Sequence, residues 1–170
     1  GWHSPYLRYE AQEGECSGNC RILPPSELIS DVQNEASHHI AAQLTEKGDY
    51  VEWVCREDAD GFLLRFSIPD SEDGNGTEDC LSLMVGDEKL ADVHLSSYHA
   101  WQYKDYRIGP GAWYLWNHNG PDRFPRMKYD EVRLHLPRKI LKGQKFSLVK
   151  AYDNDIPCTI DFVELEPVPA

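Results

Sequence analysis

The sequence lacks long hydrophobic runs and is poor in positive charge. No run of about eighteen apolar residues occurs, which excludes a membrane-spanning helix of ordinary length. The first residues also lack the basic and then apolar pattern of a signal peptide, so we expect a mature or trimmed chain. With 17 Lys and Arg against 29 Asp and Glu, the net charge is -12. This balance argues against nucleic acid or an anionic membrane as partner, because both require a broad positive field.

The few basic residues are concentrated in one part of the chain. Residues 98–150 hold 11 Lys and Arg against 4 Asp and Glu, whereas the remainder holds 6 against 25. A basic middle keeps an acidic sugar as a candidate ligand. The alternative is that these residues simply neutralise acidic neighbours, and the sequence does not choose between the two.

No second CxxC-type pair accompanies the cysteines, so nothing supports a zinc site. Cys16 and Cys20 bracket a Ser-Gly-Asn turn, which predicts a small disulfide loop. The other cysteines are Cys55, Cys80 and Cys158. One disulfide among these three would leave one thiol over, and the sequence does not select the pair. Together with a glycosylation sequon at Asn75, this usage predicts a secreted, extracellular protein.

A convincing helix is also missing, and hydrophobic residues alternate with polar ones along most of the chain. Residues 21–47 are ambiguous, and we expect a loop there with one short helical turn. Strands are predicted near residues 51–55, 62–68, 81–85, 91–95, 132–136, 146–148 and 158–162. Seven strands separated by turn clusters predict an all-β fold, an antiparallel β-sandwich of the jelly-roll type. We place one such domain at residues 9–166, between an N-terminal extension (1–8) and a tail (167–170).

Aromatic residues gather in the segment 98–116. Seven of the nineteen in the chain fall there, at Tyr98, Trp101, Tyr103, Tyr106, Trp113, Tyr114 and Trp116. Glycine and proline interrupt any helical or strand period, so we expect a surface loop. Large aromatic side chains on such a loop favour binding of a flat, partly apolar ligand.

Short motifs spread along the chain indicate a family. Tyr9-Glu10-Ala11, Gly48-Asp49-Tyr50-Val51-Glu52-Trp53 and Thr159-Ile160-Asp161-Phe162-Val163-Glu164 resemble β-jelly-roll carbohydrate-binding modules of families 6 and 35. Ser97-Tyr98-His99-Ala100-Trp101 and Tyr129-Asp130-Glu131-Val132-Arg133 resemble the subgroup attached to fungal-wall glucanases of the α-1,3-glucanase (mycodextranase) type. Their order and spacing cover the chain from about residue 9 to residue 166.

The resemblance implies a structural calcium ion between the first and last strands. Its ligands would be Glu10, Gln12 and Asp161, with a backbone carbonyl near Ser37 or His38. The family pattern has a second carboxylate where this chain has Gln12. One negative charge fewer predicts weaker calcium binding.

The resemblance also implies a sugar site at one end of the sandwich. Trp101 with Tyr98 or Tyr103 would stack on a pyranose ring, and Asp153 or Asn154 would bind its hydroxyls. Trp113 and Trp116 either extend this site or pack over the end of the sandwich.

These implications predict a secreted, non-catalytic carbohydrate-binding domain. Its ligand would be a glucan such as α-1,3- or β-1,3-glucan, and it would hold an attached or partner enzyme on the polysaccharide. We expect no enzyme, because no nucleophile–base constellation is visible. One alternative is a jelly-roll hydrolase or lyase that uses Asp130, Glu131 or His118. The other is an extracellular adhesion domain whose aromatic loop packs against a protein.

Overall fold

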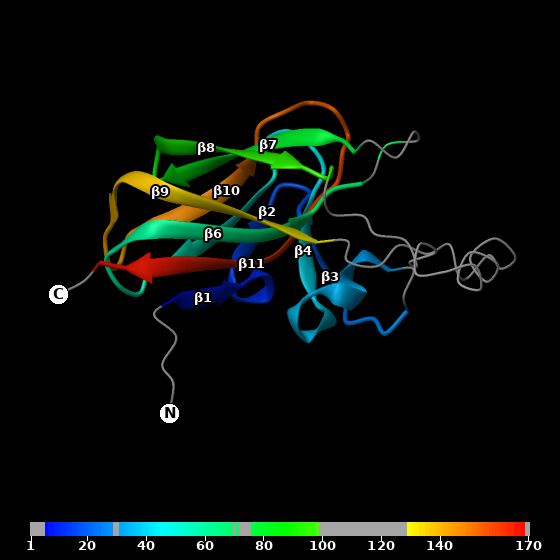
Figure 1. Ribbon diagram of the computed structural model, residues 1–170, viewed down its shortest axis with the longest axis horizontal. Coiled ribbons are helices and arrows are strands. Elements are labelled where there is room, and N and C mark those ends of the chain that lie inside the picture. The colour runs from blue at the N-terminus through cyan, green and yellow to red at the C-terminus, as the bar shows by residue number, and fades with distance from the viewer. Residues whose placement is uncertain (1–5, 29–30, 70, 72–75, 99–128, 169–170) are drawn as a thin grey trace, which may run out of the picture.

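The fold is built from two antiparallel β-sheets that pack face to face (Figure 1). The structure is a computed structural model and describes residues 6–28, 31–69, 71, 76–98 and 129–168. The six-stranded sheet has the order β3-β4-β11-β6-β9, with β1 paired to β11, and the five-stranded sheet has the order β2-β5-β10-β7-β8. This architecture confirms the predicted all-β sandwich.

The strands of the six-stranded sheet are β1 (Leu7–Glu10), β3 (Arg21–Leu23), β4 (Ala41–Leu44), β6 (Ala59–Ser67), β9 (Asp130–Ile140) and β11 (Cys158–Pro167). Those of the five-stranded sheet are β2 (Glu15–Ser17), β5 (Tyr50–Val54), β7 (Glu78–Val85), β8 (Glu88–Ser96) and β10 (Lys145–Lys150). The helices within the described ranges are single turns of 3-10 type, η1 (Ala11–Glu13), η2 (Val32–Glu35) and η3 (Ser37–His39). None of these helices has the length and apolarity needed to cross a membrane.

The core lies between the two sheets and follows from the alternation in the sequence. Successive side chains of a strand point to opposite faces, so Phe62, Leu64 and Phe66 of β6 all reach the interior. Phe146 of β10 lies at the centre of an aromatic group. Its ring packs edge-on against Tyr9 at 5.1 Å and stacks on Trp53 at 5.5 Å, both between ring centroids. Residues far apart in the chain therefore share one hydrophobic core.

The prediction for residues 21–47 was wrong in one respect. Besides the short helical turns η2 and η3, this segment contains the strands β3 and β4. The sequence of β4 does not alternate, because Ala41, Ala42 and Leu44 are all buried. What makes it a strand is its pairing with β11 on one side and β3 on the other. The segment after Tyr9 is extended through Glu10 and then turns into η1.

The structure shows which cysteines form a disulfide. Cys16 and Cys20 form a disulfide with 5.5 Å between their Cα atoms, which confirms that prediction. Cys55, Cys80 and Cys158 are free thiols and buried, so the second bridge considered from the sequence does not form.

The two ends of the sandwich differ. The start of β1 and the end of β11 lie together at the left in Figure 1. At the opposite end β6 and β8 finish while β7, β9 and β11 begin, as the register of these strands also requires. We call this the loop end. The connections 69–77, 98–129 and 151–157 all leave the strands there.

Candidate functional site

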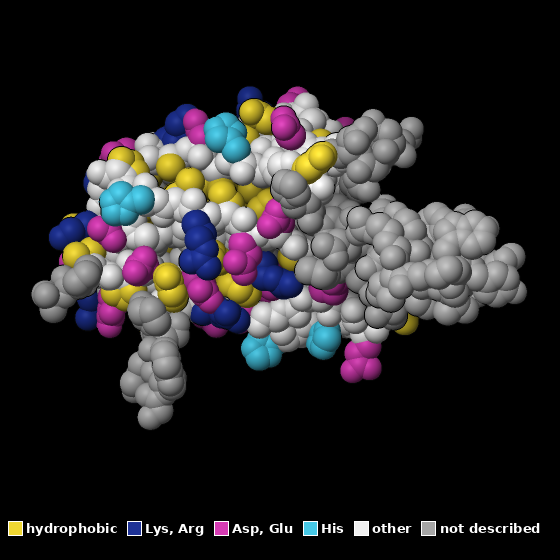
Figure 2. Space-filling view, viewed as in Figure 1, with side chains coloured by type: hydrophobic (Ala, Val, Ile, Leu, Met, Phe, Trp, Pro, Cys, Tyr) yellow, Lys and Arg dark blue, Asp and Glu magenta, His cyan; other side chains and the backbone are white. Residues whose placement is uncertain are grey.

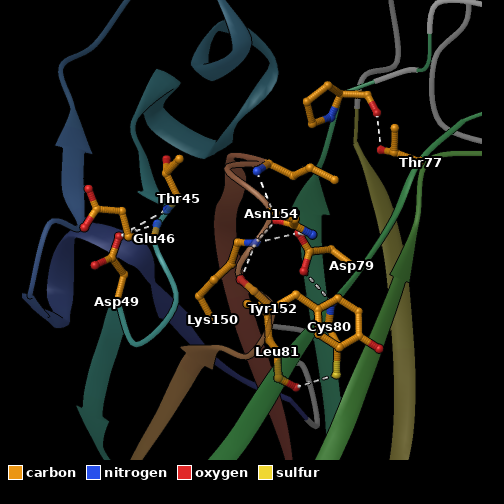
Figure 3. Close-up of polar contacts among 12 residues, drawn as sticks. Thr45, Glu46, Asp49, Thr77, Asp79, Cys80, Leu81, Lys150, Tyr152 and Asn154 are labelled. Atoms are coloured by element: carbon orange, nitrogen blue, oxygen red, sulfur yellow. Dashed lines mark hydrogen bonds and ion pairs between the residues drawn. The ribbon is translucent and has the colours of Figure 1, made fainter.

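A buried ion pair lies beneath the loop end of the sandwich (Figure 3). Lys150 is the last residue of β10 and Asp79 is the second of β7. The Lys150 Nζ lies 2.7 Å from the Asp79 Oδ2, and both side chains are 0% exposed. The alternation Phe146, Leu148, Lys150 shows how this arises, since the lysine continues the core-facing side of its strand. This pattern indicates a buried lysine, which was not among the residues predicted from the sequence.

The ion pair holds the 151–157 connection in place. The Lys150 ammonium also donates hydrogen bonds to the Tyr152 carbonyl at 3.3 Å and to the Asn154 side-chain oxygen. Asn154 in turn donates from its amide to Asp79 at 3.3 Å and accepts from the Ile156 backbone N–H at 3.0 Å. The Tyr152 ring is half-exposed and borders a cavity of about 270 Å³ that Glu78, His94 and Ser96 also line.

The residues predicted to bind sugar fall into three groups. Asn154 belongs to the buried network just described, and Asp153 beside it is exposed. Tyr98 is exposed just beyond β8. The other predicted contacts, Trp101, Tyr103, Trp113 and Trp116, lie outside the described residues. The sugar-contact assignment therefore stays a prediction.

Two of the residues predicted to bind calcium, Glu10 and Asp161, meet at the junction of β1, β11 and η3. Ser37 connects them, because its backbone N–H donates to the Asp161 Oδ1 at 2.7 Å and its hydroxyl donates to the Glu10 Oε1 at 2.9 Å. Both carboxyls are buried. Desolvation raises the pKa of Glu10, and it raises the pKa of Asp161 as well, although hydrogen bonds from Arg65 and the Ser37 N–H partly offset this.

Arg65 already supplies one positive charge to this junction. Its guanidinium pairs with the Asp161 Oδ2, donates to the Glu35 carbonyl at 3.0 Å and lies over the Tyr129 ring at 4.6 Å. The Tyr129 hydroxyl donates to the Val32 carbonyl at 2.9 Å. These contacts fix the start of β9 against η2.

Two side-chain oxygens of the predicted calcium ligands accept no hydrogen bond from the described residues. The Glu10 Oε2 and the Gln12 Oε1 are buried and have no hydrogen-bond partner among the described atoms. Buried oxygens without a donor are costly, and carboxylate and amide oxygens are the ligands that calcium prefers. These two oxygens are therefore of the type that a hard cation binds.

The candidate catalytic residues of the hydrolase alternative do not form a pair. Asp130 and Glu131 follow each other in β9, so their side chains point to opposite faces. The Asp130 Oδ1 accepts a hydrogen bond from the Glu131 backbone N–H at 2.8 Å, and Glu131 lies 3.9 Å from Arg133 on the exposed surface. His118 lies outside the described residues.

Four of the six basic residues that the structure describes between residues 129 and 150 are paired with acidic neighbours. Arg138 lies 2.6 Å from Glu88, and Lys145 lies 4.0 Å from Glu52. Side chains of both signs are interspersed over the face seen in Figure 2. This arrangement favours the interpretation that the basic residues neutralise acidic neighbours.

Comparison with known proteins gives the family. Residues 3–168 match the sequence model of the family described as alpha-1,3-glucanase catalytic domain D1. The chain belongs to this family. No curated protein matched it by sequence.

Solved structures agree with this assignment. The Agl-KA catalytic domain superposes with a TM-score of 0.83 at 27% identity, over 100% of this chain and 29% of its own. A GH87 alpha-1,3-glucanase catalytic domain in complex with nigerose has a TM-score of 0.77 at 22% identity, over 99% and 29%. The CBM36-1 domain of a multidomain xylanase from the hindgut metagenome of Trinervitermes trinervoides has a TM-score of 0.59 at 12% identity, over 97% and 99%. The last two likenesses concern the fold alone.

These findings correct two predictions. The prediction of a non-catalytic carbohydrate-binding module was wrong, and so was the expectation that the chain is not enzymatic, because the matching family is a catalytic domain. The relation to α-1,3-glucanases and the jelly-roll fold were correct. The error has a physical cause, since the chain spans less than a third of the Agl-KA catalytic domain. A missing nucleophile–base constellation in one such part says nothing about the chemistry of the whole.

Proposed function

We propose that this chain is one part of the catalytic unit of a secreted α-1,3-glucanase and acts in the hydrolysis of α-1,3-glucan. The observation that carries the proposal is the family match over residues 3–168. Since the chain corresponds to 29% of the Agl-KA catalytic domain, the unit contains a larger part that completes it. The disulfide between Cys16 and Cys20 is in keeping with an extracellular location.

The described residues act mainly as a scaffold in this proposal. Glycoside hydrolysis requires two carboxyl groups that flank the scissile bond. Glu10 and Asp161 are buried and engaged with Ser37 and Arg65, so they do not reach a substrate. The reacting carboxyls then belong to the larger part of the unit or to residues of this chain outside the described ranges.

The loop end is the part of this domain that contacts glucan in our proposal. The aromatic residues of 98–116 start from the exposed Tyr98, and a pyranose offers an apolar C–H face to such rings. Asp153 lies exposed on the neighbouring 151–157 connection, which the Lys150 network fixes. A rigid base for these loops keeps the substrate contacts in register with the rest of the unit.

Calcium completes the scaffold. Glu10, Gln12 and Asp161 would hold the ion and thereby join β1 to β11. The ion would balance the negative charge of the two buried carboxyl groups, which Arg65 alone does not neutralise.

Activity of the catalytic unit tests the function. The unit that contains this chain is expected to release new reducing ends from α-1,3-glucan. Trp101→Ala should lower kcat/KM by about tenfold, since loss of one stacking contact is worth about 1–1.5 kcal/mol. Leu141→Ala is the control, because Leu141 is an exposed apolar residue between β9 and β10, away from the loop end.

Two outcomes would contradict the proposal. Absence of product from α-1,3-glucan with a folded unit would refute the activity. Equal loss of activity in the Trp101 and Leu141 variants would refute the assignment of substrate contacts to the aromatic loop.

A further inference from the structure

Three polar side chains form a row across the outer face of the six-stranded sheet at the loop end. Thr159 at the start of β11 pairs in register with Gln43 of β4 on one side and with Ser67 of β6 on the other. Directly opposite residues of neighbouring strands present their side chains to the same face. Gln43, Thr159 and Ser67 therefore lie side by side, although 116 positions separate the first two in the chain.

This polar row forms the floor of a cavity of about 100 Å³. Its walls are apolar and are formed by Val32, Ile68, Pro69 and Pro157. The volume corresponds to roughly three water molecules, so it admits the edge of a sugar ring rather than the whole ring. None of the described residues that line the cavity carries a charge.

The hydrogen bonds within the row leave one hydroxyl, that of Ser67, without a partner among the described atoms. The Gln43 amide donates to the Thr159 hydroxyl at 3.3 Å, and its oxygen accepts from Arg21 at 3.4 Å. The Ser67 side chain, which is only 1% exposed, has a hydroxyl with no partner among the described atoms. Because buried hydroxyls are normally hydrogen-bonded, this one indicates that a polar ligand completes the site.

We propose that this cavity is a subsite for one glucosyl residue of the substrate, which inserts a hydroxyl-bearing edge toward Ser67 and Thr159. The inference rests on the proposed function and names a contact for its substrate. A sugar hydroxyl both donates and accepts, which matches the serine hydroxyl, and the C–H groups of the ring match the proline and aliphatic walls. The described lining residues carry no charge, which favours a neutral sugar over a uronate.

The position of the cavity suits this role. Ser67 ends β6 and Thr159 lies near the start of β11, so the row is at the loop end. A glucan chain that contacts the loops can place one residue in the cavity. The site is separate from the Tyr152 cavity, which shares no lining residue with it.

Titration of the 170-residue chain with nigerose, a disaccharide of α-1,3-linked glucose, tests the subsite. Backbone amide NMR shifts of Ser67, Ile68 and Thr159 are expected to move and saturate. Ser67→Ala should raise Kd between about two- and tenfold, the range for one lost hydrogen bond. Ser82→Ala is the matched control, because Ser82 is a partly buried serine of β7 in the other sheet, and Kd should stay unchanged.

The possible outcomes distinguish failure of the subsite proposal from failure of the proposed function. If the catalytic unit hydrolyses α-1,3-glucan but nigerose leaves the amides of the polar row unmoved, or Ser67→Ala binds it as the wild type does, the subsite is wrong. If nigerose moves the row while the unit does not hydrolyse α-1,3-glucan, the proposed function is wrong and the sugar site remains. Equal binding of glucuronate and glucose would overturn the selection for a neutral ligand.

Discussion

Replacing Lys150 by methionine is expected to destabilise the domain strongly. Lys150 and Asp79 are both 0% exposed, and their charged atoms are 2.7 Å apart. At an effective dielectric constant of about 20, their attraction is roughly 6 kcal/mol, most of which offsets the cost of removing both charges from water. Methionine leaves the Asp79 carboxylate buried without its cation. We therefore expect a loss of about 3–5 kcal/mol in the free energy of unfolding.

Urea denaturation of the 170-residue chain measures this loss directly. For a domain of this size the same loss lowers Tm by about 6–20 °C in a thermal scan. Lys145→Met is the matched control, since Lys145 lies on the same strand, is 61% exposed and approaches Glu52 only to 4.0 Å. An exposed pair of this kind is worth less than about 1 kcal/mol.

A double variant separates the loss of the ion-pair attraction from the free-energy cost of burying an unpaired carboxylate. Lys150→Met with Asp79→Leu replaces both charges by apolar groups, and it should recover most of the stability lost in Lys150→Met. The reasoning is refuted if Lys150→Met costs no more than Lys145→Met, or if the double variant is less stable than Lys150→Met alone.

Two further predictions concern the calcium site and the thiols. Calcium at about 100 times its Kd should stabilise the wild type by roughly 2.7 kcal/mol over a chelator. Glu10→Gln should abolish this gain in a thermal scan. Glu164→Gln should retain it, because Glu164 pairs with Arg8 in the same sheet and is not a predicted calcium ligand. Equal calcium effects in both variants would contradict the assignment. Burial raises the pKa of the thiols of Cys55, Cys80 and Cys158, so mass spectrometry should show no alkylation by iodoacetamide at pH 8 in the native state and three labels after denaturation. Rapid native labelling of any one of them would show that its site opens.

The strands with clean alternation could be predicted from the sequence. Phe62, Leu64 and Phe66 in β6 and Phe146 and Leu148 in β10 stand at every second position, and this period of two specifies both the strand and its buried face. The disulfide of Cys16 and Cys20 was also predictable, because its partners are only four positions apart and close through a local turn. The relation to α-1,3-glucanases could be predicted for a similar reason. Each motif is a short stretch of neighbouring residues, so it can be recognised without knowledge of the fold.

The catalytic character of the family was not predictable in this way. Glycoside hydrolysis requires paired carboxyl groups, and this chain spans only 29% of the Agl-KA catalytic domain. The aromatic segment 98–116 fits substrate contact in an enzyme as well as in a binding module. The sequence therefore favoured the wrong one of two functions that share the same ligand chemistry.

By itself the sequence determined the two-residue periodicity, the local disulfide and the acidic balance of charge. Only the tertiary structure decided that β4 is a strand, that Lys150 meets Asp79, and that Gln43, Thr159 and Ser67 stand in one row. These features depend on the register between strands that are distant in the chain. Register is set by hydrogen bonding and core packing across the whole sandwich, and no local pattern of residues contains it.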